Sequence, residues 1–144
     1  MSSGSRKIVV LGMLTKMPVA GVAWQTLHYL LGFQRLGYDV YYVEAHSRTP
    51  SMLMKTEEDD SSLAAADYLG SLLARFGLAG RWAFHALHAD GRCYGMTRSE
   101  LLRLYKTAAV IIFARVARVR FIVAPEKNAD RLSIEFKKRS AQTR

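Results

Sequence analysis

The segment from Lys7 to Pro50 constrains the fold of this chain more than any other stretch. It starts with a short apolar run, KIVVL, which is followed by a ten-residue loop rich in Pro and Gly, GMLTKMPVAG. A stretch with helical periodicity comes next, and a second apolar run, DVYYVEA, follows Gly37. Because the interval between the two apolar runs is too long for a hairpin, the pattern predicts a right-handed parallel β–α–β crossover.

The two apolar runs and the helix between them each carry a distinct pattern. Ile8–Leu11 is continuously apolar and is followed by Gly12, which predicts a strand buried on both faces of a parallel sheet. From about residue 22 to about residue 36 the apolar residues recur at helical spacing, and Gly37 is placed to end the helix in the left-handed conformation. The predicted buried face holds Ala23, Trp24, Leu27, Leu30 and Leu31, and the predicted polar face holds Gln25, His28 and Arg35.

Later segments complete the predicted secondary structure. A helix is expected between the acidic residues 57–60 and Gly77, a short strand at residues 82–84, a helix after the capping box at residues 97–100, and a buried strand at residues 108–113. The core stripe predicted for the first of these helices is Leu63, Ala66, Leu69, Leu73 and Phe76. The alternation predicts the α/β class, as a Rossmann-like domain with a mainly parallel sheet and flanking helices, followed by a basic C-terminal tail.

Size and composition fit one domain inside the cell. A chain of 144 residues, half of them hydrophobic, can bury a sizeable core. Its single cysteine, Cys93, excludes an internal disulfide and fits a reducing compartment. The apolar runs are too short to span a bilayer, and the polar start MSSGSRK lacks the pattern of a signal peptide. We therefore expect a cytoplasmic protein without a transmembrane segment.

Positive charge is concentrated near the C-terminus. Residues 108–144 hold nine Lys or Arg against three Asp or Glu, a net charge of +6 within a total of +9. Such a tail can bind nucleic acid or anionic lipid through phosphate neutralisation, or it can be a solvated end without a partner. No helix-turn-helix or RNA-binding signature accompanies it, so we expect no specific nucleic-acid partner.

The loop between the first strand and the first helix is the first candidate site. In nucleotide-binding folds, this turn brings backbone N–H groups at a helix N-terminus to a phosphate or another polar ligand. Its end glycines, Gly12 and Gly21, fit neither GxGxxG nor GxxxxGK[ST], which argues against a standard NAD fingerprint and a P-loop. Thr15 and Lys16 are candidate ligand contacts. The alternative is an ordinary long connection.

The end of the second strand is the second candidate site. Glu44 stands where dinucleotide enzymes place an acid for a ribose hydroxyl, and His46 and Arg48 follow it. A carboxylate close to an imidazole can raise the imidazole pKa and tune it for general base catalysis. Glu44 and His46 are therefore candidate catalytic residues, and the alternative is a polar loop leaving a sheet.

A group of His, Asp and Cys residues lies in the second half of the chain. His85, His88 and Asp90 suggest a metal site at first sight, but their spacing lacks the usual framing of zinc ligands. We therefore expect no metal. Cys93 has no obvious base beside it in the sequence, which argues against a nucleophilic role.

The order of these motifs resembles a known family. The block VVLGMLTKMPVAGVAWQTLHYLLGFQRLGYDVYYVEAHSRTP is similar to the start of the N-terminal domain of bacterial glycosyltransferases with two Rossmann-like domains, the GT-B type. The block WAFHALHADGRCYGMTRSELLRLYKTAAVII resembles the continuation of that domain. Together the resemblance covers about residues 7–112, and it rests on general pattern more than on a catalytic signature.

The resemblance implies transfer of a sugar from a nucleotide-sugar donor to a small-molecule or glycan acceptor, with no bound metal or other cofactor. In this architecture the N-terminal domain mostly holds the acceptor, and a second domain holds the nucleotide sugar. Many members carry a His in the first loop as general base; residues 13–21 contain none, so Glu44 or His46 would have to replace it. The predicted substrate-binding residues are Gly12, Thr15, Gly21, Gln25, Arg48 and Asp90.

The resemblance also divides the chain. Residues 1–112 are predicted to form the Rossmann-like acceptor-side domain, and residues 113–144 a basic tail that is disordered or encoded in a shifted reading frame. On this hypothesis the chain is a truncated, incomplete half that is inactive alone and needs a donor-binding domain or chain. The competing hypothesis is a stand-alone Rossmann-like binding module, or a partner subunit, without catalysis.

Overall fold

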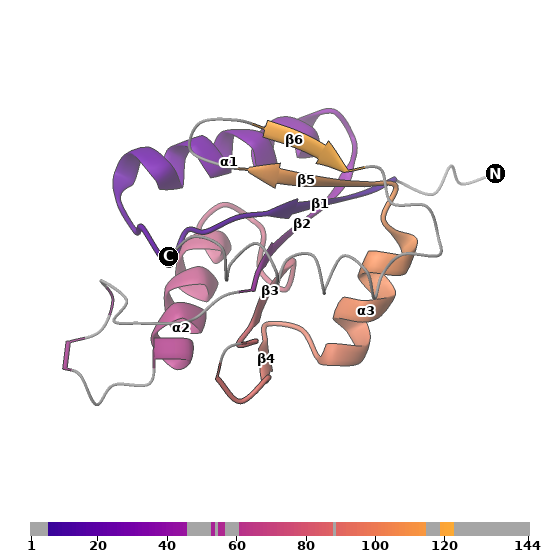
Figure 1. Ribbon diagram of the computed structural model, residues 1–144. Helices are drawn as coiled ribbons and strands as arrows, with labels where there is room; N and C mark the ends of the chain where they lie inside the picture. Colours follow the sequence, from indigo (N-terminus) through magenta and orange to yellow (C-terminus); the bar gives the residue numbers. More distant parts are fainter. Residues whose placement is uncertain are drawn as a thin grey trace.

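The computed structural model describes residues 6–45, 53, 55–56, 61–87, 89–114 and 119–122. The elements alternate between strands and helices along most of this sequence (Figure 1). In chain order they are β1 (Lys7–Leu11), α1 (Ala20–Arg35), β2 (Asp39–Glu44), α2 (Ser61–Ala74), β3 (Trp82–His85), β4 (Cys93–Tyr94), α3 (Arg98–Thr107), β5 (Val110–Ala114) and β6 (Val119–Ile122).

The strands form one sheet of six strands in the order β4-β3-β2-β1-β5-β6. The four inner strands are parallel to their neighbours, whereas β4 and β6 pair antiparallel at the two edges (Figure 1). The chain steps from β1 to β2 and β3 in one direction and then returns to place β5 on the other side of β1. This order confirms the predicted α/β class and a Rossmann-like fold with a mainly parallel sheet.

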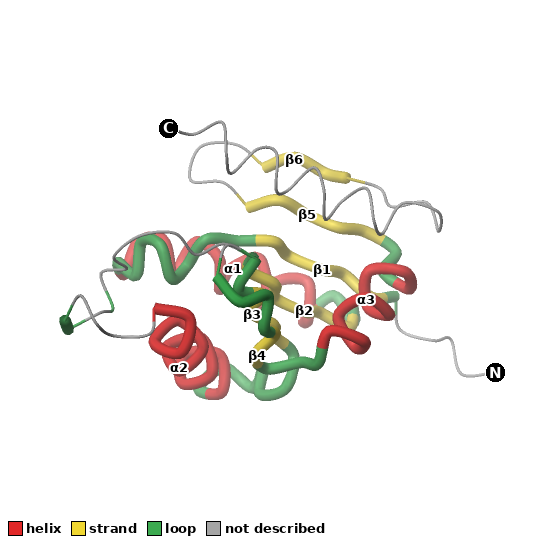
Figure 2. Tube along the Cα trace, turned by 60° about the horizontal axis from the view of Figure 1, so that its bottom comes forward, coloured by secondary structure: helices red, strands yellow, loops and turns green. Residues whose placement is uncertain are grey.

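Helices flank the sheet (Figure 2). Each face of the sheet has its own apolar core. Because side chains alternate along a strand, Ile8 and Val10 of β1 pack with α1 and α2, while Val9 and Leu11 pack with α3. Burial on both faces explains why Ile8–Leu11 of β1 are apolar without interruption.

A glycine ends α1 as the sequence predicts. Gly37 has a φ of 85°, in the left-handed region. The N–H of Tyr38 donates to the carbonyl of Phe33 (3.1 Å), and the N–H of Gly37 donates to that of Gln34 (3.0 Å). These two bonds are the Schellman motif, and the Phe33 and Tyr38 rings add its apolar contact, with centroids 6.2 Å apart.

Two further predicted helix ends are also confirmed. Gly77 has a φ of 72°, and the N–H of Leu78 donates to the carbonyl of Leu73 (3.0 Å), so α2 ends in the same way as α1. At the start of α3, the Thr97 hydroxyl accepts from the N–H of Glu100 (3.2 Å), and the Glu100 carboxylate accepts from the N–H of Thr97 (2.7 Å). This reciprocal pair is a capping box.

The predicted buried faces of the first two helices are wrong at two positions. Trp24 is 51% exposed and Leu63 is 50% exposed, while Thr26 and Ala65 are buried in the helix faces. The Trp24 ring meets the ring of Phe76 edge-on, with centroids 5.7 Å apart, at the margin of the core. Helical spacing alone does not say where the centre of the buried face lies, and the packing of the helix on the sheet decides it.

The edge strands were not predicted. β4 is two residues long and falls in a segment that reads as a loop, and β6 lies in the basic segment. β5 runs to Ala114, so the predicted division after residue 112 falls inside a strand, and β6 pairs with β5 along its length. Most of the predicted tail, residues 115–118 and 123–144, lies outside the described residues.

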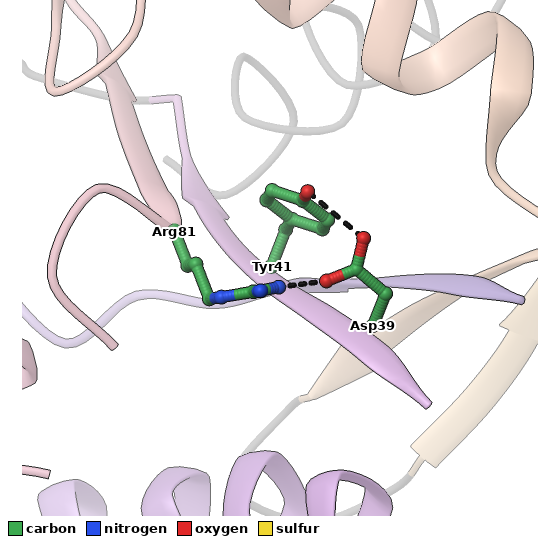
Figure 3. Close-up of polar contacts among 3 residues, drawn as sticks. All are labelled: Asp39, Tyr41 and Arg81. Atoms are coloured by element: carbon green, nitrogen blue, oxygen red, sulfur yellow. Dashed lines mark hydrogen bonds and ion pairs between the residues drawn. The ribbon is translucent and has the colours of Figure 1, made fainter. Parts of the chain in front are cut away.

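The amino edge of the sheet is joined by a small polar cluster (Figure 3). Arg81, just before β3, forms an ion pair with Asp39 at the start of β2. The Tyr41 hydroxyl donates to the same carboxylate (3.0 Å), and the Arg81 guanidinium lies 5.4 Å from the centroid of the Tyr41 ring. These contacts connect β2 and β3 at the edge opposite to the candidate site.

Candidate functional site

The strand order defines one preferred position for a ligand. In open α/β sheets, ligands bind beyond the carboxyl ends of the strands, where the strand order reverses. Here the order reverses at β1, which lies between β2 and β5. The loop that follows β1, residues 12–19, begins at this point, and the carboxyl end of the neighbouring β2 is Glu44.

Glu44 is fully buried and binds the β1–α1 loop from inside the protein. Its Oε1 accepts hydrogen bonds from the Thr15 hydroxyl (2.5 Å) and the Thr15 N–H (3.1 Å). Its Oε2 accepts from the Tyr42 hydroxyl (2.8 Å) and, at 3.3 Å, from the same Thr15 N–H. A buried carboxylate needs such donors, and here the β1–α1 loop and β2 itself supply them.

Tyr42 is the second buried residue that binds the loop. Its hydroxyl accepts a hydrogen bond from the N–H of Leu14 (3.1 Å) while it donates to Glu44. Burial and the neighbouring Glu44 charge raise the pKa of Tyr42 well above its ordinary value. The ring lies so close to Gly12 that a Cβ there would stand 2.6 Å from it. Only glycine fits at position 12 without displacing this ring.

Three further backbone donors of the loop bind within the loop. The N–H groups of Lys16 and Met17 donate to the carbonyl of Met13 (3.2 and 3.4 Å), and the N–H of Val19 donates to that of Met17 (2.8 Å). Pro18 has no N–H to offer. The loop therefore does not turn these groups outward as a phosphate-binding loop does, and its shape is set by internal bonds.

The first turn of α1 differs from the loop before it. Val19, at the N-cap, makes no side-chain cap, and the first turn holds no acidic residue. Helix geometry leaves the first N–H groups without an intrahelical partner. Gly21 is exposed there, and a Cβ added to it would have no atom within 4 Å. Gln25 is half-buried and lies one turn further along α1.

The structure thus brings together only some of the predicted site residues. Gly12, Thr15 and Glu44 meet at the carboxyl edge, and Gly21 and Gln25 share the start of α1. Asp90 instead binds Arg92 within the turn before β4. The predicted residues His46 and Arg48 lie outside the described residues.

Asp90 stabilises the turn before β4. Its carboxylate accepts from the Arg92 N–H (3.0 Å) and pairs with the Arg92 guanidinium (2.6 Å). The bond from the Arg92 backbone, followed by the Arg92 charge, lowers the pKa of Asp90. This side chain is exposed and serves the local turn.

A cluster that the sequence analysis missed lies at the carboxyl end of β3. His85, the last residue of that strand, stands directly opposite Cys93 of β4. The register thus places a histidine opposite Cys93, which the sequence did not indicate. The pairing was missed because it depends on β4, a strand of two residues without a sequence pattern. Burial raises the pKa of the Cys93 thiol, while the Arg98 charge acts in the opposite direction.

No group of three or more metal-ligating side chains occurs among the described residues. Within the same part of the chain, no helix is long and apolar enough to cross a membrane.

Fold and site together define a Rossmann-like α/β domain whose β1–α1 loop is fixed by a buried glutamate. Compared with models of known protein families, with curated proteins and with solved structures, the chain matches none. The resemblance to glycosyltransferases of the GT-B type therefore stays a prediction from the residues quoted above.

Proposed function

We propose that this chain is the acceptor-side half of a glycosyltransferase of the GT-B type. Together with a donor-binding domain or chain, it transfers a sugar from a nucleotide-sugar donor to a small-molecule or glycan acceptor in the cytoplasm, without a resident metal. The observation that carries the proposal is the β1–α1 loop, held on Glu44 and Tyr42 where the strand order reverses.

The bonding of Glu44 supports an acceptor half over a nucleotide half. An acid at the end of the second strand holds the ribose hydroxyl in dinucleotide-binding folds. Here both oxygens of that carboxylate bind Thr15 and Tyr42 under the loop. The N–H groups of loop residues 14–17 are likewise bonded inside the protein, so neither the ribose contact nor these loop N–H groups are offered to a nucleotide.

The same contacts change the role we propose for Glu44. The carboxylate positions the loop through Thr15 instead of exchanging a proton with the substrate. Thr15 is 1% exposed, so it too supports the site from inside. In this proposal the surfaces that meet the acceptor are the exposed first turn of α1, with Gly21 and Gln25, and the carboxyl end of β3.

An NMR titration of the isolated chain tests this proposal. The probes are a panel of methyl glycosides, as acceptor mimics, and UDP, GDP and NAD, as nucleotide mimics. We expect at least one glycoside to shift the amide signals of Gly21 and Gln25, with the nucleotides leaving them unchanged. A chain that binds none of the glycosides would contradict the proposal. So would sugar transfer, or hydrolysis of a nucleotide sugar, by the chain alone.

The second candidate is a binding module without catalysis. The engagement of both Glu44 oxygens favours it, because this predicted catalytic residue is bound into the structure. Binding of a nucleotide at Gly12–Gly21 in the same titration supports the module and contradicts the acceptor half. Glycoside binding without nucleotide binding supports the acceptor half.

A further inference from the structure

Trp24 is a large aromatic side chain that lies at the protein surface, one turn into α1. It is 51% exposed, although tryptophan is usually well buried. It shares α1 with Gly21 and Gln25, the two residues proposed above to meet the acceptor. We propose that the indole of Trp24 is the surface on which a sugar ring of the acceptor stacks, an assignment that rests on the proposed function.

Two neighbouring rings contact the indole. Phe76 follows α2 and packs against the core on the sheet face that α1 covers, and its ring meets the indole edge-on, with centroids 5.7 Å apart and planes at 78°. The ring of His28, one turn further along α1, lies 6.0 Å from the indole between centroids, with the planes tilted by 37°. A ring that is already positioned loses less conformational freedom when a ligand stacks on it. The exposed half of Trp24 is therefore preorganised for a flat ligand.

Gly21 leaves open space next to Trp24 on the helix. It lies three residues before Trp24, so the two positions are neighbours on one face of α1. A Cβ added to Gly21 would have no atom within 4 Å, and the Trp24 ring is therefore farther from it than that distance. Ala20 and Gly21 are both exposed. A ligand on the indole can thus extend over the first turn of α1.

The surface of α1 around Trp24 lacks charged side chains of the usual kinds. Residues 20–34 contain no Asp, Glu, Lys or Arg, although the exposed face of a helix normally carries such residues. Gln25 and His28 lie next to Trp24 on the helix, and their side chains can donate and accept hydrogen bonds. The indole therefore lies between polar side chains without a fixed charge on the same stretch of helix.

A neutral sugar ring matches these properties. Its C–H groups form an apolar face with weak positive charge, which packs on the negative face of an indole. Its hydroxyls point outward from the ring, where polar side chains beside the indole can bind them. A nucleotide would instead bring phosphate charge to a stretch of α1 that offers no Lys or Arg before Arg35. The charge of this surface thus favours a sugar over a nucleotide.

NMR of the two indole N–H groups in the whole chain tests the stacking. The chain contains two tryptophans, Trp24 and the half-buried Trp82, and comparison with Trp24→Phe assigns their signals. We expect the glycoside that shifts the amides of Gly21 and Gln25 also to shift the Trp24 indole and to leave the Trp82 indole unchanged. Glycoside binding at those amides without a change at Trp24 overturns this inference and leaves the proposed function intact. Absence of all glycoside binding overturns both.

Variants of Trp24 measure how much the stacking contributes to affinity. Trp24→Leu keeps an apolar side chain but removes the aromatic face, and we expect the glycoside to bind at least about tenfold more weakly. Trp24→Phe keeps an aromatic face and should stay within about threefold of the wild type. Leu36→Ala, at a 73% exposed position at the opposite end of α1, is the matched control without effect. An unchanged Trp82 signal shows that each variant is folded, and wild-type affinity in Trp24→Leu overturns the inference.

Anionic sugars test whether the surface selects a neutral ligand. Methyl glucuronide and methyl galacturonide join the panel beside methyl glucoside and methyl galactoside, from which they differ by a carboxylate. We expect the two uronides to bind no more tightly than the neutral sugars, because residues 20–34 of α1 hold no Lys or Arg. Tighter binding of the uronides, or a shift of the Trp24 indole by UDP, overturns the inference.

Discussion

Glu44 places a carboxylate inside the protein at the point where three segments of the chain meet. Its oxygens bind Thr15 of the loop and Tyr42 of its own strand, and burial together with the Glu44 charge raises the pKa of Tyr68 on α2. The hydrogen bonds with Thr15 and Tyr42 satisfy polar groups that would otherwise be costly to bury. The network therefore sets the shape of the loop and stabilises the fold at the same time.

Thr15→Val tests the strength of this network. The variant keeps the shape of the side chain but removes the hydroxyl that donates to Glu44 at 2.5 Å. We expect the free energy of unfolding to fall by about 1–3 kcal/mol, because a buried carboxylate loses a donor. Thr26→Val, at a buried position of α1, is the matched control and should change stability by less than about 1 kcal/mol. Urea unfolding measures both, and equal losses would contradict the account.

Alkylation of Cys93 tests the electrostatics at the end of β3. The thiolate is the reactive form, and burial raises the pKa of this thiol. We therefore expect iodoacetamide at pH 8 to react severalfold more slowly with the folded chain than with the urea-unfolded chain. Arg98→Ala should slow the reaction further, because Arg98 lowers this pKa. A faster reaction in Arg98→Ala would show that the arginine only blocks access.

At the scale of the elements, the sequence predicted what local patterns encode. The ends of α1 and α2 were predicted because Gly37 and Gly77 supply the left-handed residue that a Schellman motif needs. The inner strands were predicted because burial on both faces makes most of their residues apolar. The edge strand β4 was not, because pairing with a neighbour, and no pattern of its own, makes it a strand.

The candidate site was likewise predicted only in part from the sequence. The position of Glu44 was predicted, because it is simply the end of an apolar run. Its bonds were not, because Thr15 lies 29 residues away in the sequence and meets it only through the β1–β2 pairing. The His85–Cys93 neighbourhood was missed for a similar reason, since it depends on the register of a hairpin. Contacts between elements, and not the elements themselves, limited the prediction.

Replacement by alanine of Gly32, inside α1, and of Gly37, just after α1, should change the stability of the protein in opposite directions. Gly37→Ala places a side chain at a φ of 85°, and we expect it to destabilise the protein by about 1 kcal/mol. Gly32→Ala lies inside α1, where nothing stands within 4 Å of the new Cβ, and it should stabilise by about 0.5–1 kcal/mol. Thermal unfolding measures both changes. Two changes of the same sign would contradict the observed end of α1.

At the scale of the whole molecule, the two edges of the parallel sheet differ in construction. The amino edge is joined by the half-buried polar cluster of Asp39, Tyr41 and Arg81 (Figure 3). The carboxyl edge carries the buried Glu44 network on the face of the sheet that α1 covers, and the half-buried His85 on the face that α3 covers. This difference follows from the order of the strands, which brings the β1–α1 loop and the ends of β2 and β3 to one side. The proposed acceptor site therefore depends on how firmly Glu44 holds that loop.

Amide hydrogen exchange of Leu14 and Thr15, in the wild type and in Glu44→Gln, tests this dependence most directly. The account predicts that both amides are protected in the wild type, because they donate to Tyr42 and Glu44. In Glu44→Gln their protection should fall at least about tenfold, which corresponds to about 1.4 kcal/mol. Val9 and Ile111 in the central strands should stay protected. Free exchange of Leu14 and Thr15 in the wild type, or unchanged protection in the variant, would contradict the account.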